Sequence, residues 1–430
     1  MGRCNLINAL LPPEVFDLIY ATLRVEDPLK DALFAASLVC RSWREQTLRH
    51  RFHSLCLKVH EDGSVRPPTT GDGGPLRFEE FEDMVIVNTV KGLVRALSLN
   101  FVSGGISHAF LHFVDVFPAV HSLKLMGAFR NTAYNYAKPS PCISFDSLTV
   151  HGMQSPYGPD GQHNVKSLCS VLSQFSSVRE LSIVGLYGLL MAEDPTWSTV
   201  ALPSVSSLTL VETSTIGLTA VLIRQLAQSG ALRHIDLLAY HGEALDDGVT
   251  LAKTLPSPPD HISVSVTGWG LADDEDTAGP RPDLSGIPAI RRLSIAVELE
   301  IAKVGADSID DWQQRLNSIT WTRALKTLRS LDTSCRLTRV DLRLASADHE
   351  SSDGFLPRMH VALCQECSAR TKFEDVLVQL ARQRDLQVVC VSLYCMPPTD
   401  GEPISDWYIS PGEHLETMFP ALSGTGIMRV

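Results

Sequence analysis

The cysteines toward the end of the chain come closest to a metal-binding pattern. Cys364 and Cys367 are separated by two residues, and His360, Cys390 and Cys395 lie in the same stretch. Four thiolates can hold Zn²⁺ in a tetrahedron when two close pairs converge. The second pair is spaced too widely for that geometry, and Cys390 stands inside an apolar run. We therefore interpret these thiols as structural or inert, like small hydrophobic side chains, with a zinc site as the alternative.

Few other patterns in the sequence could carry out chemistry. It contains no Gly-x-Ser-x-Gly, no His-Glu-x-x-His and no Walker sequence. The Gly-x-Gly strings at residues 268–270 and 424–426 lack the third glycine and the following helix of a phosphate-binding loop. The acidic run 273–276 lacks the glycine of a calcium loop, so we interpret it as a solvated loop, with a contact for a basic peptide as the alternative. We expect a chain that is not an enzyme and holds no cofactor or metal; a bound cofactor would instead favour an enzyme within an α/β fold.

The distribution of charge argues against nucleic acid and membrane surfaces as partners. The formal net charge is −12, and residues 1–58 carry 8 Lys and Arg against 6 Asp and Glu, while the remainder carries 29 against 43. An acidic body does not attract phosphate backbones or anionic lipid. The ten cysteines are scattered and no Asn-x-Ser/Thr acceptor occurs, so we expect reduced thiols and a cytoplasmic or nuclear location.

Residues 11–23 have the pattern of a short amphipathic helix. Val15, Ile19 and Leu23 recur at helical spacing, and two prolines and a glutamate occupy the first turn, where they are tolerated or favoured. A second helix start follows at residues 27–28, and a third helical segment comes after it. Three short helices cannot bury all of these apolar side chains by themselves, so they need a partner.

Residues 11–56 resemble the F-box, whose pattern is Leu-Pro-x-Glu, an apolar helix and then Leu-Val-Cys-Arg-x-Trp. The matching residues are Leu11, Pro12, Glu14, Val15, Ile19, Leu23, Leu38, Val39, Cys40, Arg41 and Trp43. The linker between the two halves, residues 24–31, is longer than in most members. The resemblance implies docking onto the Skp-type adaptor of a cullin-RING ubiquitin ligase through Leu11, Pro12, Val15, Ile19, Leu23, Leu38, Val39 and Trp43. A small helical cap on the following domain is the alternative.

A six-residue frame, apolar-x-x-apolar-x-apolar, recurs along the rest of the chain. Its second apolar residues are Leu97, Leu123, Leu148, Leu181, Leu208, Ile235, Ile262, Leu293, Val340 and Val389. The third apolar residue follows two positions later in every unit, which is typical of half-buried strands. The shorter steps between units, 25 to 27 residues, leave room for a strand and a return helix. Return helices are predicted at 106–116, 164–175, 218–228, 310–331 and 373–384.

This repeat resembles an irregular leucine-rich repeat, which implies a solenoid with a parallel sheet on its concave face and helices on its convex face. The expected Asn or Cys position of the repeat holds other residues, such as Val102, Ala128 and Thr213. A doubly wound α/β domain is the alternative. The predicted fold is therefore α/β: a three-helix F-box-like module at 1–58, a connection with the first solenoid helix at 59–92, and the solenoid with a C-terminal cap at 93–430.

A binding surface follows from strand alternation, because the side chains between the apolar positions face away from the helices. The candidate target-binding residues on this face are Lys124, His151, His234, Asp236, Arg292, Arg339, Asp341 and Arg343. Any half-exposed sheet also places polar residues there, so the alternative is an ordinary solvated face. We expect a substrate-recognition subunit that joins an adaptor and an unknown protein target; a protein-interaction scaffold without a ligase role is the alternative.

Overall fold

The structure is a computed structural model of the chain. It describes residues 35, 38, 41–60, 64–66, 76–106, 110–128, 143–152, 165–185, 201–211, 218–238, 242–267, 282–301, 310–332, 334–346, 362, 367–383, 386–394 and 419–429. The chain divides into two compact units, Met1–Pro203 (unit 1) and Ser204–Val430 (unit 2). Each unit is built of strands and helices around its own part of the repeat.

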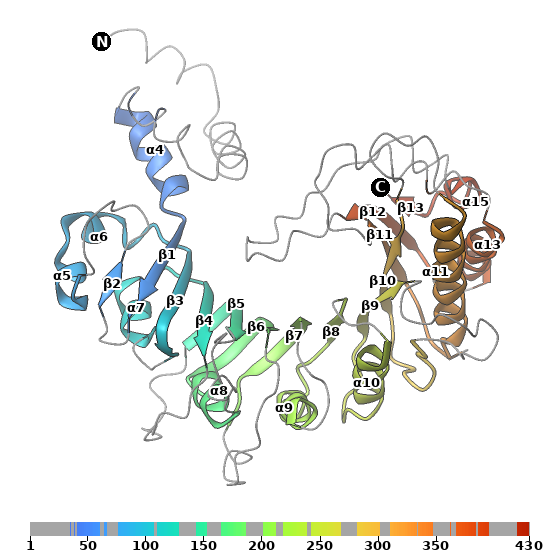
Figure 1. The fold of residues 1–430 in the computed structure, drawn as a ribbon, viewed down its shortest axis with the longest axis horizontal. Coiled ribbons are helices and arrows are strands. Elements are labelled where there is room, and N and C mark those ends of the chain that lie inside the picture. The colour runs from blue at the N-terminus through green and yellow to red at the C-terminus, as the bar shows by residue number, and fades with distance from the viewer. Residues whose placement is uncertain are drawn as a thin grey trace. The chain divides into compact units, whose positions relative to one another are not determined.

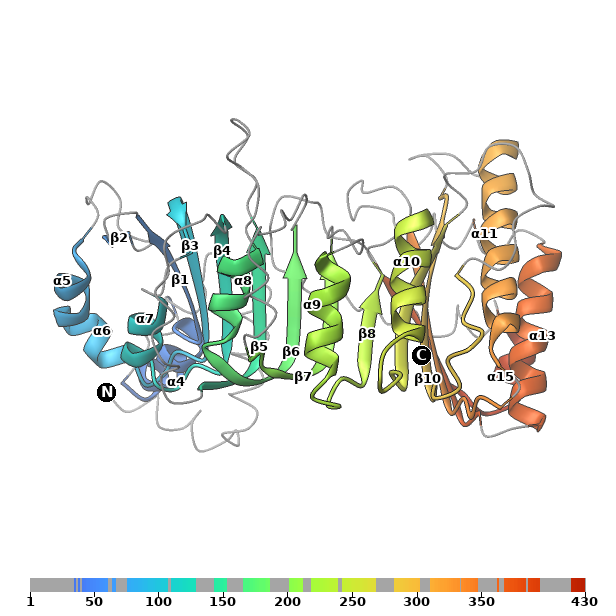
Figure 2. The same ribbon diagram turned by 90° about the horizontal axis from the view of Figure 1, so that it is seen from below.

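Unit 1 contains a mainly parallel sheet in the order β2-β1-β3-β4-β5-β6. Its elements are α4 (Arg41–Arg51), β1 (Ser54–Val59), β2 (Val65–Arg66), α5 (Phe78–Asp83), α6 (Val85–Val90), β3 (Ala96–Gly105), α7 (Phe110–Val116), β4 (Ser122–Ala128), β5 (Ile143–Gly152), α8 (Val165–Leu172) and β6 (Phe175–Val184). Only the β1–β2 pair is antiparallel among the strand pairs described in this unit. Helices α7 and α8 lie on the same face of this sheet (Figure 2).

Unit 2 contains a parallel sheet whose order, β7-β8-β9-β10-β11-β12-β13, follows the chain. Its elements are β7 (Ser204–Val211), α9 (Leu218–Ala227), β8 (His234–Leu237), α10 (Gly242–Lys253), β9 (His261–Thr267), β10 (Arg292–Leu299), α11 (Asp311–Ser330), β11 (Arg339–Ser346), α13 (Ser368–Gln383), β12 (Val388–Tyr394), α15 (Pro420–Ser423) and β13 (Met428–Arg429). Helices α9, α10, α11 and α13 cover one face of the sheet (Figure 1). In a doubly wound domain the strand order reverses at a switch point and helices cover both faces of the sheet. Here the strand order follows the chain and these helices lie on one face (Figure 1), so the alternative of a doubly wound domain does not fit.

The strand pairing confirms the repeat frame predicted from the sequence. In unit 1, Leu97, Leu123, Leu148 and Leu181 stand opposite one another in successive strands. In unit 2, the same holds for Leu208, Ile235, Ile262, Leu293, Val340 and Val389. All of these side chains are buried, and so are the third apolar residues of the frame. A slip by one residue would turn the apolar side chains to the other face, so burial fixes the register.

Aromatic side chains fill the space between helices and sheet in both units. In unit 1, Phe110 of α7 stacks on Phe175 with ring centroids 5.8 Å apart. In unit 2, Trp321 of α11 packs 5.5 Å from Phe373 of α13 and 6.2 Å from Phe419, and all three rings are buried. Burying rings of this size stabilises the packing of α7, α11 and α13.

The predicted return helices occur, with shifts at their ends. α11 matches its prediction closely because Asp310 caps it: the Asp310 carboxylate accepts a hydrogen bond from the Gln313 backbone N–H at 2.8 Å. α7 begins at Phe110 rather than at Ile106. α10 was not predicted, since glycine and aspartate residues weaken its helical pattern.

The sheet begins earlier than the sequence analysis placed it. β1 pairs with β3 so that Leu55 stands opposite Leu97. Phe52, Leu55 and Leu57 fit the six-residue frame, although all three lie within the predicted three-helix module at 1–58. β1 therefore crosses the boundary drawn at residue 58, although the division into three regions is otherwise still a prediction.

Candidate binding surface on the polar face of unit 2

The polar face of the unit 2 sheet carries two aligned rows of side chains, which we call rungs. Strand pairing places neighbouring members of each rung opposite one another. The first rung is Ser207, His234, His261, Arg292 and Arg339. The second rung, two residues further along each strand, is Thr209, Asp236, Ser263, Ser294 and Asp341. Both point away from the apolar residues of the frame because side chains alternate along a strand.

Two histidines of the first rung form a stacked pair. The rings of His234 and His261 are nearly parallel, with centroids 3.7 Å apart and 7° between their planes. His234 shares hydrogen bonds with Ser207 through Nδ1 (2.8 Å) and with Ser263 through Nε2 (2.9 Å). His261 shares one with Ser294 through Nε2 (2.9 Å). These hydroxyls hold both rings in place above the strands.

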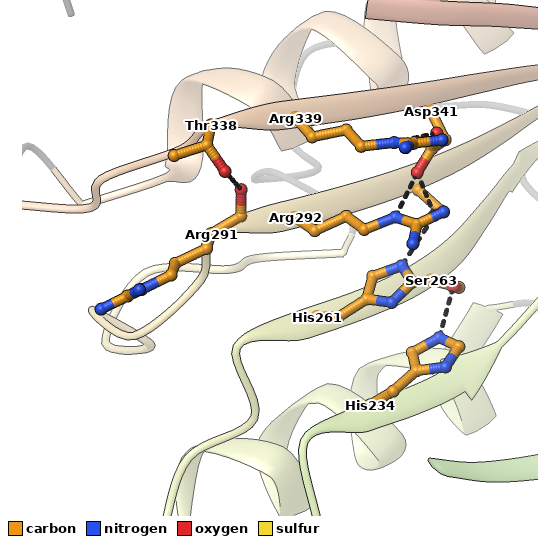
Figure 3. Close-up of polar contacts among 9 residues, drawn as sticks. His234, His261, Ser263, Arg291, Arg292, Thr338, Arg339 and Asp341 are labelled. Atoms are coloured by element: carbon orange, nitrogen blue, oxygen red, sulfur yellow. Dashed lines mark hydrogen bonds and ion pairs between the residues drawn. The ribbon is translucent and has the colours of Figure 1, made fainter. Parts of the chain in front are cut away.

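Asp341 joins two arginines of the first rung. Its two carboxylate oxygens accept hydrogen bonds from Nε of Arg292 at 2.5 Å and from Nε of Arg339 at 2.8 Å. The Ser294 hydroxyl lies 3.4 Å from the same carboxylate, which connects the arginines to His261. Figure 3 shows both arginine side chains running side by side toward Asp341. The cluster is thus one connected polar network across β8 to β11.

The histidines of this network are held in the neutral form. Burial, followed by the positive charges of Arg292 and Arg343, lowers the pKa of His234 to about 4. Burial, the neighbouring His234 and Arg292 lower the pKa of His261 to about 3. Two stacked imidazoles this close together, beside arginines, cannot readily accept protons.

The pKa values of the two carboxylates in the second rung, Asp341 and Asp236, are shifted in opposite directions. Burial would raise the pKa of Asp341, but the hydrogen bonds and charges of Arg292 and Arg339 outweigh burial and lower it. Burial raises the pKa of Asp236, although its carboxylate accepts a hydrogen bond from the Leu238 backbone N–H at 3.0 Å. Asp341 is therefore the carboxylate whose charge the network stabilises.

The Ser207–His234 contact has the composition of a nucleophile and a base, but its surroundings suit binding better. A general base works best with a pKa near the operating pH, and a pKa of about 4 makes His234 a weak base. The second nitrogen of His234 is engaged by Ser263 and not by a carboxylate. We therefore interpret the network as a fixed set of hydrogen-bonding and charged groups.

Parts of the polar face are less exposed than strand alternation suggested. Ser263, Ser265 and Ser294 are 1%, 1% and 0% exposed, so both faces of β9 and β10 are buried at these positions. The side chains of Arg292 and Arg339 are 40% and 42% exposed. Contact with a partner in this region would thus be made by the arginines.

The predicted target-binding residues fall into two groups. Six of them come together on β8, β10 and β11 of unit 2: His234, Asp236, Arg292, Arg339, Asp341 and Arg343. Lys124 and His151 lie in unit 1, on β4 and β5. His261, Ser207, Ser263 and Ser294 were not among the predicted site residues. A signal for His261 was present, because it precedes Ile262 as His234 precedes Ile235.

The predicted adaptor-binding residues are described only in part. Leu38 is 70% exposed. Trp43 is half-buried in α4 and interacts with another residue. Leu11, Pro12, Val15, Ile19, Leu23 and Val39 lie outside the described residues. The adaptor-binding surface remains a prediction.

The cysteines of the possible zinc site are also described in part. Cys367 and Cys390 are free thiols, whereas His360, Cys364 and Cys395 lie outside the described residues. Burial raises the pKa of Cys390, and Asp341 adds to this effect against the opposing charge of Arg339. Within the described ranges, no cluster of His, Cys, Asp and Glu side chains could hold a metal ion. None of the helices described has both the length and the apolar character to span a bilayer.

Comparison with models of known protein families finds no match to this chain, and comparison with curated proteins finds none either.

Proposed function

We propose that this chain is the substrate-recognition subunit of a Skp-cullin-F-box type ubiquitin ligase, acting in the cytoplasm or nucleus without catalysing a reaction. In this proposal the N-terminal helices bind the Skp-type adaptor, and the polar face of the sheet binds a protein target. Joining both contacts in one chain raises the effective concentration of the target near the ligase.

The observation that carries the proposal is the common register of β7 to β12. One register across these strands sets polar side chains at fixed spacing on one face, over a fully apolar opposite face. A surface supported in this way is rigid, and rigid elements favour specific recognition. The polar network on this face has neutral histidines, so its chemistry supports binding rather than proton transfer.

The exposure of Leu38 supports the adaptor contact. A leucine 70% exposed beside a helix gains stabilisation when a partner covers it, and Leu38 stands at a matching position of the F-box pattern. Trp43 stands at another matching position, in α4. Both side chains lie within a few residues of each other in the chain.

The test is binding of the full chain to a purified Skp-type adaptor, measured by isothermal calorimetry. Leu38→Ala should weaken binding by on the order of tenfold, since burying a leucine is worth about 1.5–3 kcal/mol. Trp312→Ala is the matched control, because Trp312 is also an exposed hydrophobic residue (52%) but lies in α11 of unit 2. It should bind like the unchanged chain.

Two results would remove the ligase proposal. One is a chain that does not bind the adaptor at micromolar concentration. The other is equal binding by the Leu38→Ala and Trp312→Ala variants. A chain that captures a protein target but no adaptor would be the interaction scaffold.

A further inference from the structure

The exposed charges on the polar face of unit 2 are positive. Arg292 and Arg339 expose 40% and 42% of their side chains, and Arg343 is half-buried on the same face of β11. The carboxylates among them are covered: Asp341 is 6% exposed, and Glu298 is 8% exposed and accepts a hydrogen bond from Ser265. An approaching partner therefore meets guanidinium groups before it meets carboxylates.

This cationic cluster stands out against the charge of the whole chain, which is −12. The histidines beside it do not change its sign, because His234 and His261 are neutral. Asp236 is half-buried and accepts a hydrogen bond from a backbone N–H, and burial raises its pKa. The cluster of Arg292, Arg339 and Arg343 is thus a local positive region on an acidic protein.

The guanidinium groups occupy two places. Arg292 and Arg339 both reach along their strands to Asp341, one rung further on. Arg343 lies beyond Asp341 on β11, and its charge acts on His234, His261 and Asp236, which belong to β8 and β9. Each guanidinium has five N–H donors, and the bond to Asp341 through Nε uses one donor of Arg292 and one of Arg339.

We propose that the Arg292, Arg339 and Arg343 cluster binds an acidic segment of the target protein that carries two neighbouring carboxylate side chains. One carboxylate is bound by the Arg292 and Arg339 pair, and the other by Arg343. Two cationic positions suit two carboxylates better than a single phosphate group, whose oxygens lie around one atom. Guanidinium groups pair with carboxylates through parallel hydrogen bonds. This inference rests on the proposed function, since it names the kind of target that the polar face recognises.

The probe is a short fluorescein-labelled peptide of alternating Glu and Ser, titrated with the full chain and followed by fluorescence anisotropy. Two further peptides have Gln in place of every Glu; one has no other charge and the other carries a single phosphoserine. The Glu-Ser peptide should bind, and added salt should weaken it because exposed charges are screened. The uncharged peptide should not bind.

Arg343→Gln is the decisive variant. Among the described residues Arg343 makes no hydrogen bond or ion pair, so the substitution should leave the fold unchanged. It should raise the Kd for the Glu-Ser peptide by about fivefold, the upper range for an exposed ion pair. Arg343→Lys keeps the charge and should lose less. The matched control is Arg224→Gln, an exposed arginine of α9 on the helical face, which should leave the Kd unchanged.

Three outcomes would overturn the inference: no binding of the Glu-Ser peptide at low salt, equal Kd values for Arg343→Gln and Arg224→Gln, or binding of the phosphoserine peptide alone. Circular dichroism of each variant shows whether it is folded. Adaptor binding by the same samples separates the two proposals. If the adaptor binds and the acidic peptide does not, only the identity of the target fails.

Discussion

The stacked histidine pair makes a sharp prediction about stability and pH. An unfolded histidine has a pKa of about 6.5, whereas the folded values are about 4 for His234 and about 3 for His261. As pH falls below about 6.5, the unfolded chain takes up protons that the folded chain does not. Stability is therefore lost between about pH 6.5 and the folded pKa values, and the loss levels off below them.

The free energy of unfolding falls by about 1.36 kcal/mol per histidine for each pH unit over which the histidine is protonated in the unfolded chain only. Between about pH 7 and about pH 5 each histidine should cost about 2 kcal/mol, and the pair about 4 kcal/mol. Asp236 acts in the opposite direction, because burial raises its pKa and protonation then favours the folded state. Asp341 does not contribute in this range, since its lowered pKa places its loss at lower pH.

The assay is urea unfolding at both pH values, followed by circular dichroism, with hydrogen exchange of β8 and β9 peptides to localise the change. The double variant His234→Gln/His261→Gln keeps groups that can bond to the serines but removes both titrations. Its loss of stability between the two pH values should be smaller than that of the unchanged chain by several kcal/mol, by the same reasoning. If both proteins lose equal stability, the pair is not held neutral by the fold and the reasoning is refuted.

Substitutions at four positions test other parts of the structure. Asp341→Ala removes two charge-assisted hydrogen bonds to arginines that are partly exposed. It should lower the free energy of unfolding, measured by urea titration, by about 2 kcal/mol. Asp341→Asn should lower it by less. An unchanged value for both would mean that the arginines hold no strand in place. Gly185→Ala should destabilise by more than about 3 kcal/mol, because φ is +68° and the new Cβ would lie 2.8 Å from a backbone oxygen. Gly230→Ala has the same φ and open space, so it should cost about 1–2 kcal/mol, and equal melting temperatures of the two variants would contradict the clash. Asp310→Ala should cost about 1 kcal/mol by loss of the α11 cap, seen as faster hydrogen exchange in its first turn; unchanged exchange there would count against the cap.

The register of the sheet was predictable from the sequence because one physical rule repeats. Every unit must bury two alternating side chains on the apolar face of its strand, so Leu208, Ile235 and Ile262 stand at equivalent positions whatever residues separate them. β1 shows the limit of this reasoning. Leu55 and Leu57 fit the frame, but they also lie within the predicted helical module at 1–58, and only the pairing with β3 shows that they belong to the sheet.

The polar network was less predictable. Alternation correctly placed His234, Arg292 and Asp341 on one face, since that depends only on strand period. Their contacts depend on side-chain direction: Arg292 leans one rung along its strand to reach Asp341, and His261 stacks on its neighbour. Such choices depend on burial and neighbouring charge, which a single sequence does not reveal.

The outermost strands have a consequence for self-association. β2 ends the sheet of unit 1 and β13 ends that of unit 2, and each has two residues. A longer free strand would present a row of unused backbone donors and acceptors onto which another copy could add. So short a terminal strand offers little length for such pairing, and β2 also runs against the direction of the strands behind it. Two-residue outermost strands are thus poor templates for edge-to-edge growth of the repeat.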